Sequence, residues 1–489
     1  MNKKKILILL LLVAGIVYSN SLMAGFVQDD YALIVNKQAY FSHPVTVVRI
    51  LTSSDAPLGG KNPYYRPVNT FSYMLDHYFW GLHPFWYHLE NLLIHCGVVV
   101  LFYLLLLEVF GKQRLAFFAA ILFAVWPANV ESVDWVSARN TLFCAFFSMA
   151  SLLFLAKGGA KWIWLSFLTY FLALLSKEPA AAVPLFLVSY ALTRAKSAWR
   201  GYPEKIKIKK AVAFAGFFVA TAVYFLIRHL VLGAFTSNAG IGLSLSRLEL
   251  ISSVYFENFR LMIFPFKLNA DYTRRWLFFD WAKAAGAVLG ILLLVYFSLA
   301  KRTPEPVRAG AQWVFWGLLP VSGIIKIPSA AVAERYQYTF LFGFVLILGY
   351  CLARLQERKA LTGAVIAFAL VLALGVTAFK RNFVWRNDMS LYSSMIQADP
   401  GNAKAHCNLG TVYAQLGDDG FAIGEFKAAL AYDPKLVQAR LNLGMAYANE
   451  EHYRKAAVEF ETALKLDPGN APAMTYLNRL ESHGDTSEK

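Results

Sequence analysis

Long hydrophobic runs separated by short polar stretches fill the first three quarters of the chain. Each run has roughly 15 to 22 residues, enough for a helix that crosses a membrane. They lie near residues 6–24, 89–109, 115–128, 141–156, 162–176, 179–193, 211–228, 282–300, 312–325, 336–353 and 361–379. This pattern predicts an all-α, polytopic membrane helix bundle with about 11 spans over residues 1–379.

One further apolar stretch, residues 248–266, has a different pattern. Glu249, Glu257 and Arg260 interrupt it, and a crossing there would disturb the alternation of basic loops along the chain. We therefore expect this stretch to lie in the membrane interface or to re-enter the membrane, without spanning it.

Beyond residue 379 the pattern changes to that of soluble paired helices. Asp-Pro recurs at 399/400, 433/434 and 467/468, a spacing of 34 residues, which is the length of a tetratricopeptide (TPR) repeat. Two full units share matched positions: Leu409, Gly410, Tyr413, Ala422, Phe426, Ala429 and Pro434, then Leu443, Gly444, Tyr447, Ala456, Phe460, Ala463 and Pro468. Residues 380–489 are therefore predicted to form a short TPR α-solenoid, with a half repeat at 385–400, repeats at 403–436 and 437–470, and a capping helix at 471–483.

Composition and charge support a membrane protein and argue against a nucleic-acid partner. Hydrophobic residues make up 57% of the chain, too many for an ordinary soluble domain. The formal net charge is +16, but residues 380–489 carry 12 basic and 14 acidic residues, so the excess lies in the loops between apolar runs. Lys3, Lys4 and Lys5 precede the first run, which predicts a cytoplasmic N-terminus and, after an odd number of spans, an extracytoplasmic TPR domain.

The first outer loop would then present an acidic pair, Asp29 and Asp30, just beyond the first span. Carboxylates at that depth are costly unless they serve a function. Further acidic residues follow in the second outer loop, where Glu131 is the first candidate and Asp134 the next. The pattern predicts acid–base chemistry at the outer face.

Basic residues on the same side run against the usual distribution of charge in membrane proteins. They are Arg66, Arg139, Lys177, Arg228, Lys326 and Arg335. A phosphate group at the outer leaflet would explain them, because arginine and lysine are its natural partners. Arg66, Arg139, Lys177 and Arg335 are the predicted phosphate contacts.

Other polar residues near these loops are candidates for supporting roles. His88, Asn91 and His95 share one helix face, which suits a polar seam between helices or a metal site. Glu178, Glu334 and Tyr336 belong to compact charged islands between apolar runs. These islands could equally be paired interfacial charges.

The order of these strings resembles a known family. The chain shows Asp-Asp after the first span, Tyr65-Arg66-Pro67, Gly81-x-x-Pro84-x-x-Tyr87-His88-x-x-Asn91, Pro127-x-x-x-Glu131-Ser-Val, Ser176-Lys177-Glu178 and Ala333-Glu334-Arg335-Tyr336, followed by the repeats. Together they are similar to the transmembrane and TPR O-mannosyltransferases, within the GT-C glycosyltransferases. Trp126 departs from the pattern, since the family suggests histidine before this proline.

The resemblance implies an inverting sugar transfer from a polyprenyl-phosphate donor to Ser/Thr hydroxyls of exported proteins, with Asp29 or Asp30 as the base. The short repeat array suggests a bacterial inner-membrane member using an undecaprenyl lipid, with the TPR domain in the periplasm and a polypeptide acceptor or partner in the TPR groove. No obligatory cofactor is predicted, and a divalent cation such as Mg²⁺ or Mn²⁺ is left open. The alternatives are a non-enzymatic TPR scaffold and a GT-C transferase that acts on lipid or glycan acceptors.

Overall fold

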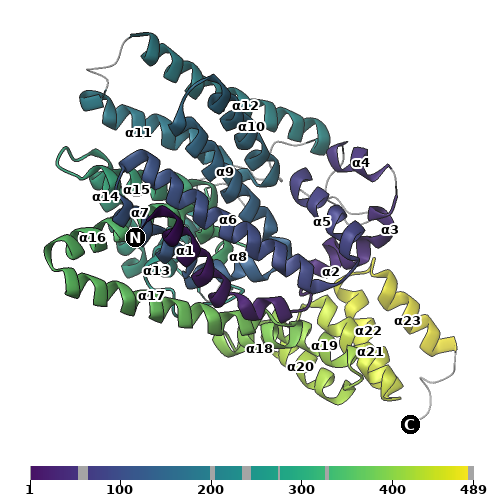
Figure 1. Ribbon diagram of the computed structural model, residues 1–489. Coiled ribbons are helices and arrows are strands. Elements are labelled where there is room, and N and C mark those ends of the chain that lie inside the picture. The colour runs from purple at the N-terminus through teal and green to yellow at the C-terminus, as the bar shows by residue number, and fades with distance from the viewer. Residues whose placement is uncertain are drawn as a thin grey trace. The chain divides into compact units, whose positions relative to one another are not determined.

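The computed structural model describes residues 2–43, 45–52, 64–198, 204–233, 244–273, 276–324 and 330–482. Lys326 and the last residue of the predicted capping helix lie outside these ranges. Within them the chain forms helices and short turns with no strand, so the all-α fold class is confirmed. The chain divides into two compact units, Met1–Trp385 and Arg386–Lys489 (Figure 1).

The first unit contains most of the helices. Its α-helices are α1 (Lys3–Val17), α2 (Asp29–Leu33), α3 (Gln38–Phe41), α4 (Thr46–Thr52), α5 (Pro67–Trp80), α6 (Pro84–Phe110), α7 (Gln113–Ala124), α8 (Val130–Asp134), α9 (Arg139–Lys157), α10 (Ala160–Ser176), α11 (Val183–Ala198), α12 (Glu204–Leu232), α13 (Leu245–Ile263), α14 (Trp281–Leu299), α15 (Glu305–Leu318), α16 (Glu334–Arg358) and α17 (Ala360–Asn382). Short 3₁₀ turns join them: η1 (Ser19–Met23), η2 (Val35–Lys37), η3 (Pro127–Asn129), η4 (Val136–Ala138), η5 (Glu178–Ala182), η6 (Leu319–Val321) and η7 (Phe383–Trp385).

Among the residues that the structure describes, six helical segments are long and apolar enough to cross a membrane. They are Pro84–Phe110, Val136–Lys157, Phe214–Leu232, Trp281–Leu299, Glu334–Arg358 and Ala360–Trp385, and α7 with Pro127–Asp134 forms a further pair bent by 55°. Pro127 explains the bend, because proline removes a backbone donor and cannot continue the preceding helix. The predicted count of 11 is therefore not confirmed, since several of the predicted runs, such as α1 with 15 residues and α15 with 14, form short helices.

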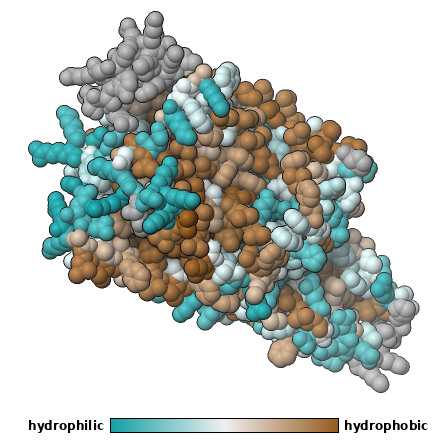
Figure 2. Space-filling model, in the orientation of Figure 1, coloured by the Kyte–Doolittle hydropathy of each residue, from teal (hydrophilic) through white to brown (hydrophobic). Residues whose placement is uncertain are grey.

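Hydrophobic side chains cover much of the surface of the first unit in the view of Figure 2. Among the candidate spans, Trp281–Leu299 has only 17% of its apolar window buried and Ala360–Trp385 only 22%. Leu292 is 59% exposed and Phe368 70% exposed. Surfaces of this kind are stable in contact with lipid and unfavourable in water, which supports a membrane location for this unit.

The second unit consists of antiparallel helix pairs with the expected 34-residue period. Its helices are α18 (Asp388–Ala398), α19 (Ala403–Gln415), α20 (Asp419–Tyr432), α21 (Val437–Asn449), α22 (Tyr453–Leu466) and α23 (Ala471–Ser482). A Cβ atom on Gly410 would lie 2.7 Å from the Phe426 ring, and one on Gly444 would lie 2.6 Å from the Phe460 ring. The repeated glycine therefore lets the second helix of each pair pack directly against the first, and the predicted TPR solenoid is confirmed.

Candidate active site

The two neighbouring aspartates of the first loop have different environments. Asp30 is fully buried, and its carboxylate accepts hydrogen bonds from the backbone N–H of Val27 at 3.1 Å and of Ser137 at 2.7 Å. The Ser137 hydroxyl donates a further bond to the same carboxylate. Asp29 is exposed at the start of α2. Asp30 therefore fastens the loop to η4, whereas Asp29 is an exposed residue.

The backbone between these contacts is strained. Gln28 has φ of 50°, a left-handed conformation that a residue with a side chain adopts at a cost of order 1 kcal/mol or more. It directly precedes Asp29, and the Val27–Asp30 hydrogen bond spans it. The bonds of Asp30 thus hold a turn that sets the direction of the Asp29 side chain.

Both carboxyl groups have raised pKa values, for which burial is the main cause. Burial raises the pKa of Asp30 to about 7, against the lowering effect of the hydrogen bonds from Ser137 and Val27. Partial loss of solvation raises the pKa of the Asp29 carboxyl too, although the residue as a whole is exposed, and the positive charge of Arg335 opposes this shift. Asp29 is therefore a stronger base than a solvated aspartate, and its electrostatic neighbour is an arginine.

Arg335 is fixed from several directions at the start of α16. Its guanidinium forms an ion pair with the buried Glu131 carboxylate, and its backbone N–H donates to the other Glu131 oxygen at 2.7 Å. The guanidinium also lies over the rings of Trp135, at 5.1 Å, and Tyr336, at 5.2 Å. Both Glu131 carboxylate oxygens thus accept hydrogen bonds from Arg335.

Lys177 lies in the turn between α10 and η5 and is 6% exposed. Its ammonium group donates to the Thr141 hydroxyl at 2.6 Å and lies 5.8 Å from the Tyr336 ring centre. Burial, together with the positive charges of Arg66 and Arg335, lowers its pKa to about 7. Three basic side chains from distant parts of the chain therefore lie within electrostatic reach of one another.

Glu178 joins a fourth basic residue to this group. Its carboxylate accepts from Arg66 at 3.0 Å through one oxygen and from Arg228 at 2.7 Å through the other. Burial would raise the pKa of Glu178, but the two guanidinium groups lower it to about 2. Glu178 is thus ionised and shared by two arginines.

We call Arg66, Lys177, Arg228 and Arg335 the cation cluster. Two paired carboxylates, Glu131 and Glu178, face these four bases, and Asp29 lies within electrostatic reach of Arg335, which leaves an excess of about one positive charge when all are ionised. A buried excess of this kind favours an anion, and a phosphate has the charge and acceptor oxygens to bind there. Arg228 belongs to the cluster through its ion pair with Glu178, which lies 50 positions earlier in the chain. No local sequence pattern reveals this pairing.

Arg139 lies in a separate network and not in the cation cluster. It is fully buried and forms ion pairs with Asp76 at 2.6 Å and Glu90 at 2.8 Å. Asn91 accepts from its Nε at 2.7 Å, and the His88 ring lies 3.3 Å from the Gly25 carbonyl oxygen. Through these bonds Arg139 joins α5, α6 and α9. The structure thus gives no support to its predicted contact with a phosphate.

The remaining predicted residues lie close to the ends of α16 and α17. Glu334 accepts from Arg381 at 2.9 Å and from the Tyr272 hydroxyl at 3.4 Å. The Tyr336 hydroxyl donates to the Ala330 carbonyl at 3.1 Å. Arg381 was not among the predicted site residues, because its partner precedes it by 47 positions.

Metal ligation has no ready-made site in the ranges that the structure describes. There, no group of three or more His, Cys, Asp or Glu side chains is arranged to hold a metal ion. His88 and Asn91 are engaged within the bundle. Metal dependence therefore stays an open prediction.

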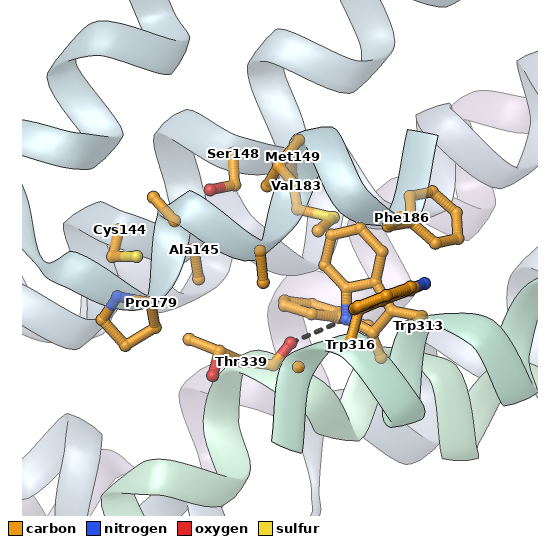
Figure 3. A pocket seen from close by; sticks show the side chains of 14 residues that line it. Cys144, Ala145, Ser148, Met149, Pro179, Val183, Phe186, Trp313, Trp316 and Thr339 are labelled. Carbon is orange, nitrogen blue, oxygen red and sulfur yellow. Dashed lines mark hydrogen bonds between the residues drawn. The ribbon is translucent and has the colours of Figure 1, made fainter. Parts of the chain in front are cut away.

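An apolar pocket lies between α9, η5, α11, α15 and α16 (Figure 3). Cys144 and Pro179 lie at one end, and the Cys144 thiol donates to the Lys177 carbonyl at 3.7 Å. Trp313 and Trp316 lie toward the other end, where the Trp313 indole donates to the Thr339 carbonyl at 2.8 Å. The cavity volume is about 30 Å³. The lining matches a hydrocarbon chain in polarity, but a chain segment would enter only if the lining side chains moved apart.

Known proteins provide an independent comparison. Residues 437–470 match the family model of the tetratricopeptide repeat. The chain is 26% identical over 438 residues to Protein O-mannosyl-transferase F38B6.6 of Caenorhabditis elegans, covering 85% of this chain and 60% of that protein. It is 25% identical to Protein O-mannosyl-transferase TMTC3 of Homo sapiens, covering 82% of this chain and 48% of that protein. The chain thus spans about half of the length of these relatives.

Two solved structures also align with the chain. One is the archaeal oligosaccharyltransferase AglB from Archaeoglobus fulgidus, in complex with an inhibitory peptide and a dolichol-phosphate, with 16% identity, a TM-score of 0.45 and coverage of 80% of this chain and 55% of that one. The other is ArnT from Cupriavidus metallidurans bound to undecaprenyl phosphate, with 15% identity, a TM-score of 0.44 and coverage of 96% and 80%. The resemblance inferred from the ordered motifs is confirmed by the sequence relatives: over most of its length the chain is similar to proteins named protein O-mannosyl-transferases.

Proposed function

We propose that this chain is an integral membrane glycosyltransferase that moves a mannose-like sugar from a polyprenyl-phosphate donor to Ser/Thr hydroxyls of exported proteins. The observation that carries the proposal is the exposed carboxyl of Asp29, placed within electrostatic reach of Arg335 and the cation cluster. A base beside an anion site is what a transfer from a sugar phosphate requires. The names of the similar proteins point the same way.

In the proposed reaction Asp29 accepts the proton of the acceptor hydroxyl as its oxygen attacks the anomeric carbon. The bond between that carbon and the phosphate oxygen breaks, and the polyprenyl phosphate leaves with the bonding electron pair. Attack on the face opposite the leaving group inverts the anomeric configuration. Asp30 takes no proton in this scheme, because its carboxylate already accepts from Ser137 and Val27.

The cation cluster would bind the donor phosphate and stabilise the charge that grows on it as the bond breaks. Arg335 and Arg66 are held by Glu131 and Glu178 and need little reorganisation during the reaction. The first part of the lipid chain would lie at the apolar pocket lined by Pro179, once its side chains move apart to admit it. We propose no obligatory metal in this reaction.

The second unit would bind a polypeptide, either the acceptor or a partner protein, in the groove of its TPR helices. Lys3, Lys4 and Lys5 before α1 favour a cytoplasmic N-terminus. If α1 crosses the membrane and the number of crossings is odd, Asp29 and the TPR unit lie at the extracytoplasmic face, which is the periplasmic side of a bacterial inner membrane. Exported proteins would meet both on that side.

The proposal is tested in cells that export a defined set of proteins. Intact masses of these proteins are compared between cells with the wild-type chain, with Asp29→Asn and with Glu108→Gln. The last variant is the control, because Glu108 is an exposed carboxylate near the C-terminal end of α6. We expect hexose additions with the wild type and Glu108→Gln, and their loss with Asp29→Asn. Identical masses in all three strains would refute protein glycosylation and favour a scaffold or a transferase for lipid or glycan acceptors.

A further inference from the structure

The last segment of the first unit, residues 379–385, comprises the end of α17 and the 3₁₀ turn η7. It contacts three segments around the candidate site. Asn382 donates to the Val17 carbonyl at 2.7 Å and to the Asn20 side chain at 2.6 Å, and Asn20 donates back to the Phe379 carbonyl at 3.1 Å. These bonds connect the end of α17 to the turn between α1 and η1. The chain reaches Asp29 only nine residues beyond Asn20.

A second contact goes to the start of α16. The Arg381 guanidinium forms an ion pair with Glu334 at 2.9 Å, and the Glu334 side chain is fully buried. Glu334 directly precedes Arg335 in the chain. Because the backbone N–H of Arg335 is bonded to Glu131, a displacement of Glu334 would also disturb the arginine.

The third contact is aromatic. Trp385 is 1% exposed and stacks on Trp135, with ring centres 5.8 Å apart and planes inclined by 21°. Trp135 is also the ring over which the Arg335 guanidinium lies. Trp385 is the final residue of the first unit, a place where a connecting segment would ordinarily be polar and exposed.

We propose that Arg381 and Trp385 are positioning residues of the transfer site: they hold Glu334 and Trp135, and through them the Arg335 guanidinium. The segment that leads to the TPR unit is then part of the support of the active site. This inference rests on the proposed glycosyl transfer. It goes beyond it by assigning a role in the reaction to residues that contact neither the donor nor the acceptor.

The test compares full-length variants in the same 3₁₀ turn. Trp385→Ala removes the stacked ring, Trp385→Phe keeps an aromatic ring, and Phe383→Ala is the matched control, because Phe383 is 50% exposed. We expect Trp385→Ala to lower kcat about 10- to 100-fold, since small displacements of a catalytic group have effects of this size. The KM for the acceptor should stay unchanged, Trp385→Phe should recover most of the rate, and Phe383→Ala should match the wild type.

A second measurement follows Trp135 directly and does not depend on activity. In protein labelled with 5-fluorotryptophan, the ¹⁹F signal of Trp135 is identified by its loss in Trp135→Phe. We expect this signal to move in Trp385→Ala and to stay in place in Phe383→Ala. If Trp385→Ala fails to fold, Arg381→Lys replaces it, with a lowered kcat expected because the shorter side chain reaches Glu334 less well.

The outcomes separate the two proposals. An unchanged kcat in Trp385→Ala, or in Arg381→Lys where that variant replaces it, would overturn the positioning role while leaving the proposed function intact. A wild-type protein that transfers no sugar would refute the proposed function. In that event an unmoved Trp135 signal would overturn the structural part of the inference, and a shifted signal would support it.

Discussion

Lys177 provides a quantitative prediction for donor binding, because its charge depends on pH in the range where the protein would work. Burial, aided by Arg66 and Arg335, lowers its pKa to about 7. About half of the Lys177 side chains are then neutral at pH 7 and about nine tenths at pH 8. An anionic donor binds to the charged form, so its affinity should fall about fivefold between pH 7 and pH 8. Above pH 8 the affinity should fall by a factor that approaches about tenfold for each pH unit.

The sign of this effect follows from proton linkage. A bound phosphate favours the ammonium form and raises the pKa of Lys177, so donor binding near pH 7 takes up part of a proton. In Lys177→Met this dependence should disappear. At about pH 6, where the wild-type lysine is mostly charged, the variant should bind about 10- to 150-fold more weakly, which corresponds to a charge-assisted hydrogen bond of about 1.5 to 3 kcal/mol.

The assay is titration of the protein in lipid nanodiscs with a fluorescent polyprenyl-phosphate sugar across this pH range. The ligand is a phosphodiester whose single negative charge does not change there, so a slope reports the protein. Lys112→Met, an exposed lysine at the start of α7, is the control. An affinity of the wild type that does not vary with pH, or a slope retained in Lys177→Met, would refute the reasoning.

Three further predictions concern stability. Asp30→Asn should lower the free energy of unfolding by about 1 to 3 kcal/mol, because an amide cannot accept all the bonds that the buried carboxylate receives. Thermal unfolding measures this loss, and an unchanged midpoint would contradict the role of Asp30 in fastening the loop to η4. Arg139→Met should cost about 3 to 5 kcal/mol by leaving its two carboxylate partners unpaired, while donor affinity of the folded fraction stays at the wild-type value; weakened binding would return Arg139 to the donor site. Gly444→Ala should destabilise the TPR unit by about 1 to 3 kcal/mol, because the added Cβ would lie 2.6 Å from the Phe460 ring; limited proteolysis in urea detects this, and unchanged resistance would count against the close packing.

The repeat unit was predictable from sequence because its signals are local and recur. The Asp-Pro turns and the glycines at 410 and 444 return after 34 residues, and each glycine is explained by the phenylalanine of its own repeat. The number of membrane spans was harder to predict. Hydropathy marks apolar runs, but it does not show that α7 bends at Pro127 or that α1 and α15 are short.

The candidate site was predictable in its location but not in the roles of its residues. Asp29 and Asp30 are equivalent in sequence, and only the contact of Asp30 with Ser137, 107 positions later, separates them. Arg139 shares the interfacial setting of Arg335, yet their different carboxylate partners place one in the bundle and the other beside Asp29. Such pairings are made by the tertiary fold, and a local pattern of charges cannot reveal them.

The central claim is that Asp29 is the base of a sugar transfer to a hydroxyl, with Asp30 holding its loop. It is tested most directly with purified protein in nanodiscs, a polyprenyl-phosphate mannose donor and a peptide that contains serine and threonine. The measurement is the intact mass of the peptide after incubation with the wild type or with Asp29→Asn. We predict the addition of one hexose by the wild type and none by Asp29→Asn at equal protein stability. A peptide left unmodified by the wild type, or modified equally by both proteins, would contradict the account.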